Sequence, residues 1–234
     1  NQIIMLALRG LINIVSVAAS VSSDEIKALP GLAGALSSPQ YSGYLDLPPT
    51  SGGGPAGKHL HYWLVKSESP TAASDPVVFW FNGGPGCSSL DGYFYEHGPY
   101  HVIEPVVNTS AGVPTLIQNP NRWNQIANVV FLEAPAGVGF SYADTKNGTV
   151  HTDTTTAEDN FAAVQKFYEG FPELKANDLF ISGESYAGMY VPTLALEILA
   201  HNERVVAVGL GGAGVDTIPL KGILVGNGVT GEGT

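Results

Sequence analysis

The chain has 234 residues, of which 44% are hydrophobic; this excludes a disordered protein and is enough for one large domain. Its net charge of −11 excludes the basic surface that nucleic-acid binding requires, so we expect no nucleic-acid partner. One cysteine and six scattered histidines are too few for a clustered metal site, and we expect neither a metal nor another cofactor.

In chain order, the first predicted element is a signal peptide over residues 1–22. Arg9 precedes an apolar stretch at residues 11–19 that ends in small side chains, as a cleavable signal does. A membrane anchor needs about 20 uninterrupted apolar residues. Because Arg9 interrupts that length, we expect no stable membrane anchor, and we expect residues 23–234 to form the folded domain.

Apolar runs then alternate with helical patterns along the chain. The runs predict buried strands at residues 59–65, 77–81, 128–132, 179–181 and 221–227. A first helix is predicted at 152–170, because threonine and aspartate can cap its start and Pro172 follows its end. A second helix follows Ser185 and extends to about Asn202, with a bend at Pro192. This alternation predicts a parallel sheet with both faces covered, the architecture of the α/β class.

Ser185 lies between the strand at 179–181 and the second helix, in the sequence Gly-Glu-Ser-Tyr-Ala-Gly. A strand, a sharp turn with a serine and then a helix form a nucleophile elbow. The small residues Gly183 and Ala187 let the strand and the helix cross closely, although the strict pattern has glycine at both positions. The motif therefore predicts acyl-transfer chemistry with Ser185 as the nucleophile.

A glycine-rich segment, Asn82-Gly83-Gly84-Pro85-Gly86-Cys87-Ser88-Ser89, follows the strand at 77–81. Hydrolases with a nucleophile elbow take one oxyanion-binding N–H from such an earlier loop and another from the residue after the serine. Glycine lets the backbone approach a substrate without a Cβ in between. A purely structural turn is the other interpretation of this segment.

Four further segments, together with these two motifs, make the chain resemble the serine carboxypeptidase family of cathepsin A and carboxypeptidase Y. They are Tyr41–Leu45, Glu96–Pro99, Trp123-Asn124 and Pro135–Tyr142. The resemblance extends from about Asp24 to Gly228. It implies an incomplete α/β-hydrolase fold: the N-terminal part of a mostly parallel sheet with flanking helices, without the cap and the C-terminal strands.

The resemblance also implies a role for each matching position. Ser185 would form the acyl-enzyme, and the N–H groups of Gly84 and Tyr186 would form the oxyanion hole. The substrate's terminal carboxylate would be bound by Asn82, Gly83, Glu96 and Glu184, with Trp80 bracing them. Two neighbouring carboxylates share a proton at acidic pH, and the protonated one can donate to that carboxylate. Without the resemblance, both glutamates would be read as surface charges.

The sequence lacks partners for Ser185. On this fold the triad follows the order serine, aspartate, histidine, but His201 is the sole histidine after Ser185 and lies in the same predicted helix. At about 1.5 Å per residue it would be roughly 24 Å away, so we expect a surface residue. The resemblance implies that longer family members supply the aspartate, the histidine and a cysteine that pairs with Cys87. We therefore expect a truncated chain that is inactive alone.

We expect the N-terminal part of an acid serine-type carboxypeptidase, with peptides as substrates and a C-terminal chain of the same enzyme or a second copy as partner. An acyltransferase related to serine carboxypeptidases and a non-catalytic chain that acts by binding are the alternatives. Two glycosylation acceptor triplets, at Asn108 and Asn147, favour secretion. We expect the secretory pathway, with a lysosome, a vacuole or the extracellular space as destination.

Overall fold

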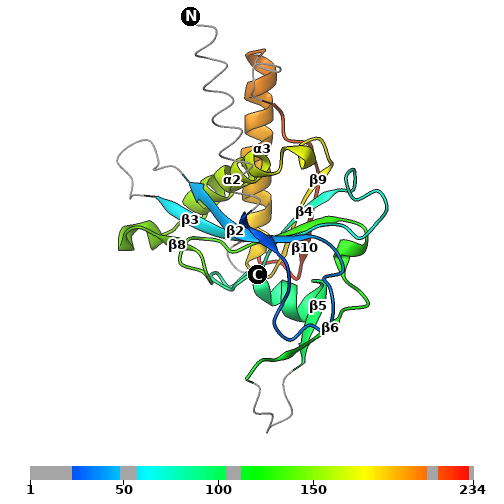
Figure 1. The fold of residues 1–234 in the computed structure, drawn as a ribbon. Helices are drawn as coiled ribbons and strands as arrows, with labels where there is room; N and C mark the ends of the chain where they lie inside the picture. The colour runs from blue at the N-terminus through cyan, green and yellow to red at the C-terminus, as the bar shows by residue number, and fades with distance from the viewer. Residues whose placement is uncertain (1–22, 48–56, 104–111, 210–215, 232–234) are drawn as a thin grey trace, which may run out of the picture.

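The computed structural model describes residues 23–47, 57–103, 112–209 and 216–231. The predicted signal peptide and Asn108 lie outside these residues. The described strands form an eight-stranded sheet in the order β1-β2-β3-β7-β4-β9-β10, with β8 paired to β3 (Figure 1). The strands are β1 (Glu25–Ile26), β2 (Gln40–Leu47), β3 (Lys58–Val65), β4 (Val77–Phe81), β7 (Asn128–Leu132), β8 (Tyr142–Ala143), β9 (Leu179–Glu184) and β10 (Leu220–Gly226). A separate antiparallel pair consists of β5 (Tyr100–Ile103) and β6 (Thr115–Gln118).

The sheet is mixed. Strands β7, β4, β9 and β10 are parallel to one another and form the parallel part that the sequence predicts. Strands β1, β2, β3 and β8 form an antiparallel part, and β3 joins the two parts by pairing antiparallel with β7. All residues of β4 and β7 are buried, as expected for continuous apolar runs in the centre of a sheet.

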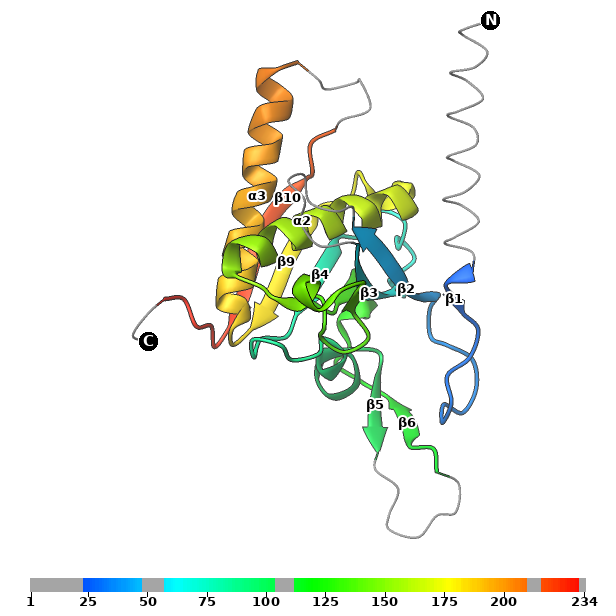
Figure 2. The ribbon, with the colours of Figure 1, turned by 90° about the vertical axis from the view of Figure 1, so that its left-hand side faces the viewer.

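The two long helices are α2 (Asp153–Gly170) and α3 (Ala187–Ala207). Thr152 caps α2 in a reciprocal capping box with Thr155. Both helices pack on the same face of the sheet (Figure 2). Their apolar side chains and those of the strands form one core. Four short helical turns complete the fold: η1 (Gly92–Glu96), η2 (Trp123–Gln125), η3 (Lys146–Thr149) and η4 (Pro172–Leu174).

Both faces of the sheet are covered, as the sequence predicts, but among the described residues the two long helices cover only one of them. The second face is covered by aromatic side chains from the segments between β4 and β7, among them Tyr93, Tyr100 and Trp123, which form a second apolar core. Hydrophobic periodicity identifies a helix but does not state on which face of a sheet it packs. None of the described helices is long and apolar enough to cross a membrane.

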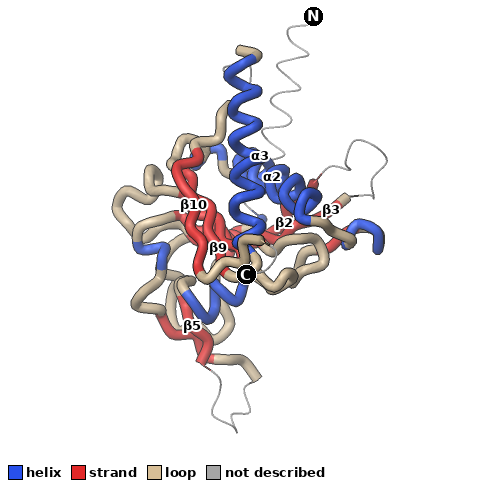
Figure 3. The backbone as a smooth tube through the Cα atoms, turned by 180° about the vertical axis from the view of Figure 1, so that it is seen from behind, coloured by secondary structure: helices blue, strands red, loops and turns tan. Residues whose placement is uncertain are grey.

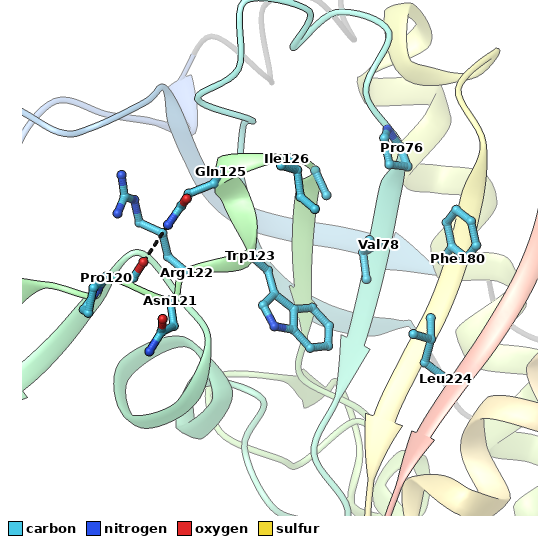
Figure 4. Close-up of a pocket in the computed structure, with 11 residues that line it drawn as sticks. Pro76, Val78, Pro120, Asn121, Arg122, Trp123, Gln125, Ile126, Phe180 and Leu224 are labelled. Atoms are coloured by element: carbon cyan, nitrogen blue, oxygen red, sulfur yellow. Dashed lines mark hydrogen bonds between the residues drawn. The ribbon is translucent and has the colours of Figure 1, made fainter.

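The second face is open beside β9 and β10. A pocket of about 520 Å³ lies there, with Val78, Trp123, Phe180 and Leu224 among its lining residues (Figure 4). Phe180 lies near the start of β9, whereas Ser185 follows the end of that strand, so this pocket is not the site around Ser185. Strand β10 ends the sheet order and lies at its outer edge (Figure 3).

Candidate active site

Ser185 occupies the turn between β9 and α3 and has a φ of 56°, a left-handed conformation that residues other than glycine rarely adopt. Backbone hydrogen bonds hold this strained residue on both sides. Its N–H donates to the carbonyl of Gly226 at 3.0 Å, and its carbonyl accepts from Val229 N at 2.8 Å. A Cβ at Gly183 would lie 2.5 Å from the Ala187 Cβ, so the strand and helix cross as closely as the motif predicts.

The glycine-rich segment packs directly against this turn. A Cβ at Gly83 would lie 2.4 Å from Tyr186 N and 2.9 Å from the Ser185 Cβ. Gly84 has a φ of 107° and is exposed. Among the described residues, the N–H groups of Gly84 and Tyr186 have no hydrogen-bond acceptor. Two free N–H donors beside the serine are what an oxyanion hole requires.

The close approach at Gly83 gives a stability prediction. Gly83→Ala is expected to lower the free energy of unfolding by about 1–3 kcal/mol, the usual cost of overpacking, because its Cβ meets backbone atoms that cannot move aside. Chemical denaturation followed by circular dichroism measures this change. Gly231→Ala is the control, since a Cβ there meets nothing within 4 Å. Equal stability of the two variants would show that the segment packs less closely.

A hydrogen-bonded network centred on Asn82 lies next to the turn. The Asn82 side-chain amide donates to Glu96 Oε1 at 3.0 Å and to Glu184 Oε1 at 3.1 Å, so it joins the two carboxylates. Its carbonyl oxygen accepts from Trp80 Nε1 at 2.7 Å and from Gly92 N at 3.1 Å. Asn82 is buried and both glutamates are half-buried, which differs from the solvated surface charges of the alternative interpretation.

Burial raises the pKa of the Glu96 carboxyl above its ordinary value. The hydrogen bond from Asn82 opposes this shift, and the negative charges of Glu184 and Asp91 add to it. Glu96 therefore retains its proton to a higher pH than an exposed glutamate does. A protonated Glu96 is a hydrogen-bond donor at the edge of the site, where a fully ionised pair would repel an anion.

The structure describes all six histidines of the sequence, and none of them forms a hydrogen bond with Ser185. His97 is buried against the rings of Trp123 and Phe131, and burial lowers its pKa to about 3. His201 is partly exposed, bonds to the backbone carbonyl of Asp216 and packs against Phe161. Its place in α3 excludes it as a base for Ser185.

Three residues of the site were not predicted. Ser89 accepts from Asn82 N at 3.2 Å, and a Cβ at Gly92 would lie 2.3 Å from Trp80 Nε1. Glu133 contacts Ser88 in the glycine-rich segment from a position far along the chain. Ser89 and Gly92 lie in or just after the glycine-rich segment, so their positions in the sequence could have identified them as site residues. The sequence contains no comparable signal for Glu133.

The remaining predicted positions are accessible. Cys87 is an exposed free thiol, and Asn147 is exposed at the start of its acceptor triplet in η3. Within the ranges that the structure describes, no three histidine, cysteine or acidic side chains are grouped as metal ligands.

A sequence profile of the serine carboxypeptidase family matches residues 30–234. The chain belongs to this family. Mouse lysosomal protective protein is 47% identical over 211 residues, and the match covers 90% of this chain and 38% of the relative. Serine carboxypeptidase-like 20 of Arabidopsis thaliana is 45% identical over 204 residues, covering 87% of this chain and 38% of the relative. The chain thus spans about two-fifths of the length of these relatives.

The fold is shared with a solved family structure. A prohormone-processing carboxypeptidase from Saccharomyces cerevisiae superimposes with a TM-score of 0.70 and 28% sequence identity. The superposition covers 90% of this chain and 44% of that structure. The described residues therefore form part of an α/β-hydrolase fold, as the sequence predicts, with a mixed sheet and helices packed against it.

Proposed function

We propose that this chain is the N-terminal part of a serine-type carboxypeptidase that releases C-terminal residues from peptides through an acyl-enzyme on Ser185. The observation that carries the proposal is the Asn82 amide between the carboxylates of Glu96 and Glu184, next to the turn that holds the serine. An endopeptidase has no use for such a network, because its substrates bring no carboxylate to the scissile bond.

In the proposed reaction, Ser185 Oγ attacks the carbonyl carbon of the last peptide bond and loses its proton to a general base. The resulting oxyanion accepts hydrogen bonds from Gly84 N–H and Tyr186 N–H, which have no other acceptor among the described residues. The C–N bond breaks, the C-terminal amino acid leaves with a proton, and water later hydrolyses the ester. We assign the general base to family sequence outside these 234 residues, because none of the six histidines bonds to Ser185.

Recognition of the C-terminus is proposed to use the Asn82 network. The proton of Glu96 donates to the substrate carboxylate. The two amide hydrogens of Asn82 hold Glu96 and Glu184 in place for this contact, and the Trp80 hydrogen bond fixes the orientation of Asn82. The raised pKa of Glu96 supports this role under acidic conditions, because the donor then persists.

The test compares an N-blocked dipeptide that has a free C-terminus with its C-terminal amide, using the whole protein. We expect release of the C-terminal amino acid from the acid and much slower cleavage of the amide. Ser185→Ala is expected to lower kcat by roughly 10⁶-fold, as the loss of a triad serine does in other serine proteases. Equal cleavage of the two substrates, or activity in Ser185→Ala, would contradict the proposal.

A binding role without catalysis is the second candidate, and the lack of any histidine bonded to Ser185 favours it. A fluorophosphonate probe separates the two candidates, because labelling of Ser185 requires an activated hydroxyl. If the probe labels Ser185 in the whole protein, the result supports the carboxypeptidase. If the probe does not label Ser185, the result supports the binding role.

The proposed localisation is the secretory pathway, ending in a lysosome, a vacuole or outside the cell. The exposed acceptor Asn147 and the similarity to a relative named lysosomal protective protein support it. The proposed partner, besides the peptide, is a C-terminal chain of the same enzyme or a second copy. The outer position of β10 and the exposed side chains of Ile223 and Leu224 support such a partner.

A further inference from the structure

A fully buried carboxylate, that of Glu133, lies directly after the end of β7. Its Oε2 accepts from Phe140 N at 2.8 Å and lies 3.0 Å from His61 Nδ1. Its Oε1 accepts from the hydroxyl of Ser88. The segment before Phe140 wraps closely around this group, because a Cβ at Gly139 would lie within 2.5 Å of all three carboxyl atoms.

The backbone of Glu133, like its side chain, is hydrogen-bonded to His61 in β3. Its N–H donates to the carbonyl of His61 at 3.0 Å. Its carbonyl accepts from Ser141 Oγ at 2.6 Å, and that oxygen in turn accepts from His61 N at 2.8 Å. Side chain and backbone are thus held to β3 independently, so the carboxylate has little freedom to move.

Hydrogen bonds keep Glu133 ionised in spite of its burial. Burial acts to raise the pKa of this carboxyl, but donation from His61, Ser88 and Phe140 N outweighs it and lowers the pKa below the ordinary value. The second nitrogen of the His61 ring lies 2.8 Å from Ser42 Oγ. Both ring nitrogens of His61 are therefore hydrogen-bonded, which fixes the ring against the Glu133 carboxylate.

Two consecutive serines, Ser88 and Ser89, connect the glycine-rich segment to Glu133 and the end of β7. Ser88 donates to the Glu133 carboxylate and accepts from Leu90 N at 3.2 Å. Ser89 donates to the carbonyl of Leu132 at 2.7 Å. The C-terminal end of the segment is therefore fastened to the end of β7 at two adjacent points, one of them an anion.

The position of Ser88 is transmitted to Gly84 through backbone contacts. A Cβ at Gly84 would lie 2.6 Å from Gly86 N and 2.8 Å from Cys87 N, so Gly84 packs against the backbone just before Ser88. Cys87 N also donates to the Gly83 carbonyl at 3.1 Å, which closes the turn. A shift of Ser88 must move Cys87, and with it the direction of the Gly84 N–H.

We propose that Glu133, held by His61, is a positioning residue that aims the Gly84 N–H at the developing oxyanion through Ser88; the catalytic part of this role rests on the proposed function. The group acts on the transition state and leaves substrate binding unchanged, because the oxyanion forms only when Ser185 attacks. Glu133 lies 45 residues from Ser88 and 72 residues from His61 in the chain.

The test uses the whole protein with the variants Ser88→Ala and Glu133→Gln. Hydrogen exchange of residues 83–89 is expected to become about 2- to 10-fold faster, the effect of losing one hydrogen bond, with α2 unchanged. The kcat for a free-carboxylate dipeptide is expected to fall about 10- to 100-fold at constant KM, less than the loss of a whole oxyanion donor.

Ser67→Ala is the matched control. Its hydroxyl likewise donates to a carboxylate, that of Asp75 at 2.6 Å, but it lies before β4 and outside the site. This variant is expected to change neither the exchange of residues 83–89 nor kcat, even where it lowers the melting temperature.

The results distinguish failure of the positioning role of Glu133 from failure of the proposed carboxypeptidase function. Unchanged exchange in Ser88→Ala overturns the proposal, and so does faster exchange with unchanged kcat in an active enzyme. If Glu133→Gln does not fold, Ser88→Ala decides alone. If the unaltered whole protein has no carboxypeptidase activity, the proposed function fails, and the exchange of residues 83–89 alone supports or overturns the positioning by Glu133.

Discussion

A polypeptide of these 234 residues is expected to hydrolyse peptides about 10⁶-fold more slowly than a complete family enzyme, the loss seen when a triad histidine is removed. The reason lies in the surroundings of Ser185. A serine hydroxyl is a weak nucleophile until a neighbouring base takes its proton. Each histidine of the sequence has its contacts elsewhere, and none of them bonds to Ser185.

The rest of the site survives in such a polypeptide, so the loss should be confined to the chemical step. Gly84 and Tyr186 keep their free N–H groups, and the Asn82 network is complete within the described residues. A product-like peptide acid should therefore still bind. A residual rate of about 10³–10⁴-fold over the uncatalysed reaction is expected from these groups alone.

Turnover of a free-carboxylate dipeptide measures the first effect, with the yeast prohormone-processing carboxypeptidase as the complete family member. Fluorophosphonate labelling measures the reactivity of Ser185 directly. Ser185→Ala is the control and should lower the already slow turnover only slightly. Turnover within tenfold of the yeast enzyme would show that a base exists within these 234 residues.

The central strands were predictable because their sequences are continuously apolar. Strands β4 and β7 have the predicted bounds, since burial on both faces leaves a run of consecutive apolar residues in each; Asn128 at the start of β7 is the one polar residue of the two strands. Strand β2 was not predicted: its exposed positions alternate with buried Leu45 and Leu47, and Gly43 interrupts the run. Its partner β3 and the register between them identify it in the structure.

The site was only partly predictable from the residues themselves. The elbow at Ser185 and the glycine-rich segment are local motifs, and local conformation explains both. The Asn82 network is different, because Glu184 lies 102 residues from Asn82 and their contact depends on the pairing of β4 with β9. The resemblance supplied these residues, whereas a contact such as Glu133 to Ser88 follows only from the folded chain.

The second large effect is expected in the pH dependence of substrate binding. In the whole enzyme, KM for a free-carboxylate peptide is expected to rise about 10- to 100-fold as the pH rises through the raised pKa of Glu96, which corresponds to one hydrogen bond to a charged group. Below that pKa, Glu96 carries a proton and donates to the substrate carboxylate. Above it, Glu96 is an anion and repels the same carboxylate.

Kinetics with two substrates isolate this group. An ester or amide of the same peptide lacks the carboxylate, so its KM should change little over the same pH range. The double variant Glu96→Gln, Glu184→Gln keeps amide donors without a titrating proton and should flatten the KM profile for the free acid. A KM profile that stays the same in the double variant would remove the two glutamates from substrate recognition.

The single variant Glu184→Gln separates the two causes that raise the pKa of Glu96, which are burial and the charge of neighbouring carboxylates. Burial is the largest cause and remains in this variant, whereas the charge of Glu184 is removed. The rise in KM should therefore move to lower pH without disappearing. Asp91→Asn should shift it in the same direction, since the charge of Asp91 also raises the pKa of Glu96. A shift to higher pH in either variant would mean that a group other than Glu96 controls binding of the C-terminus.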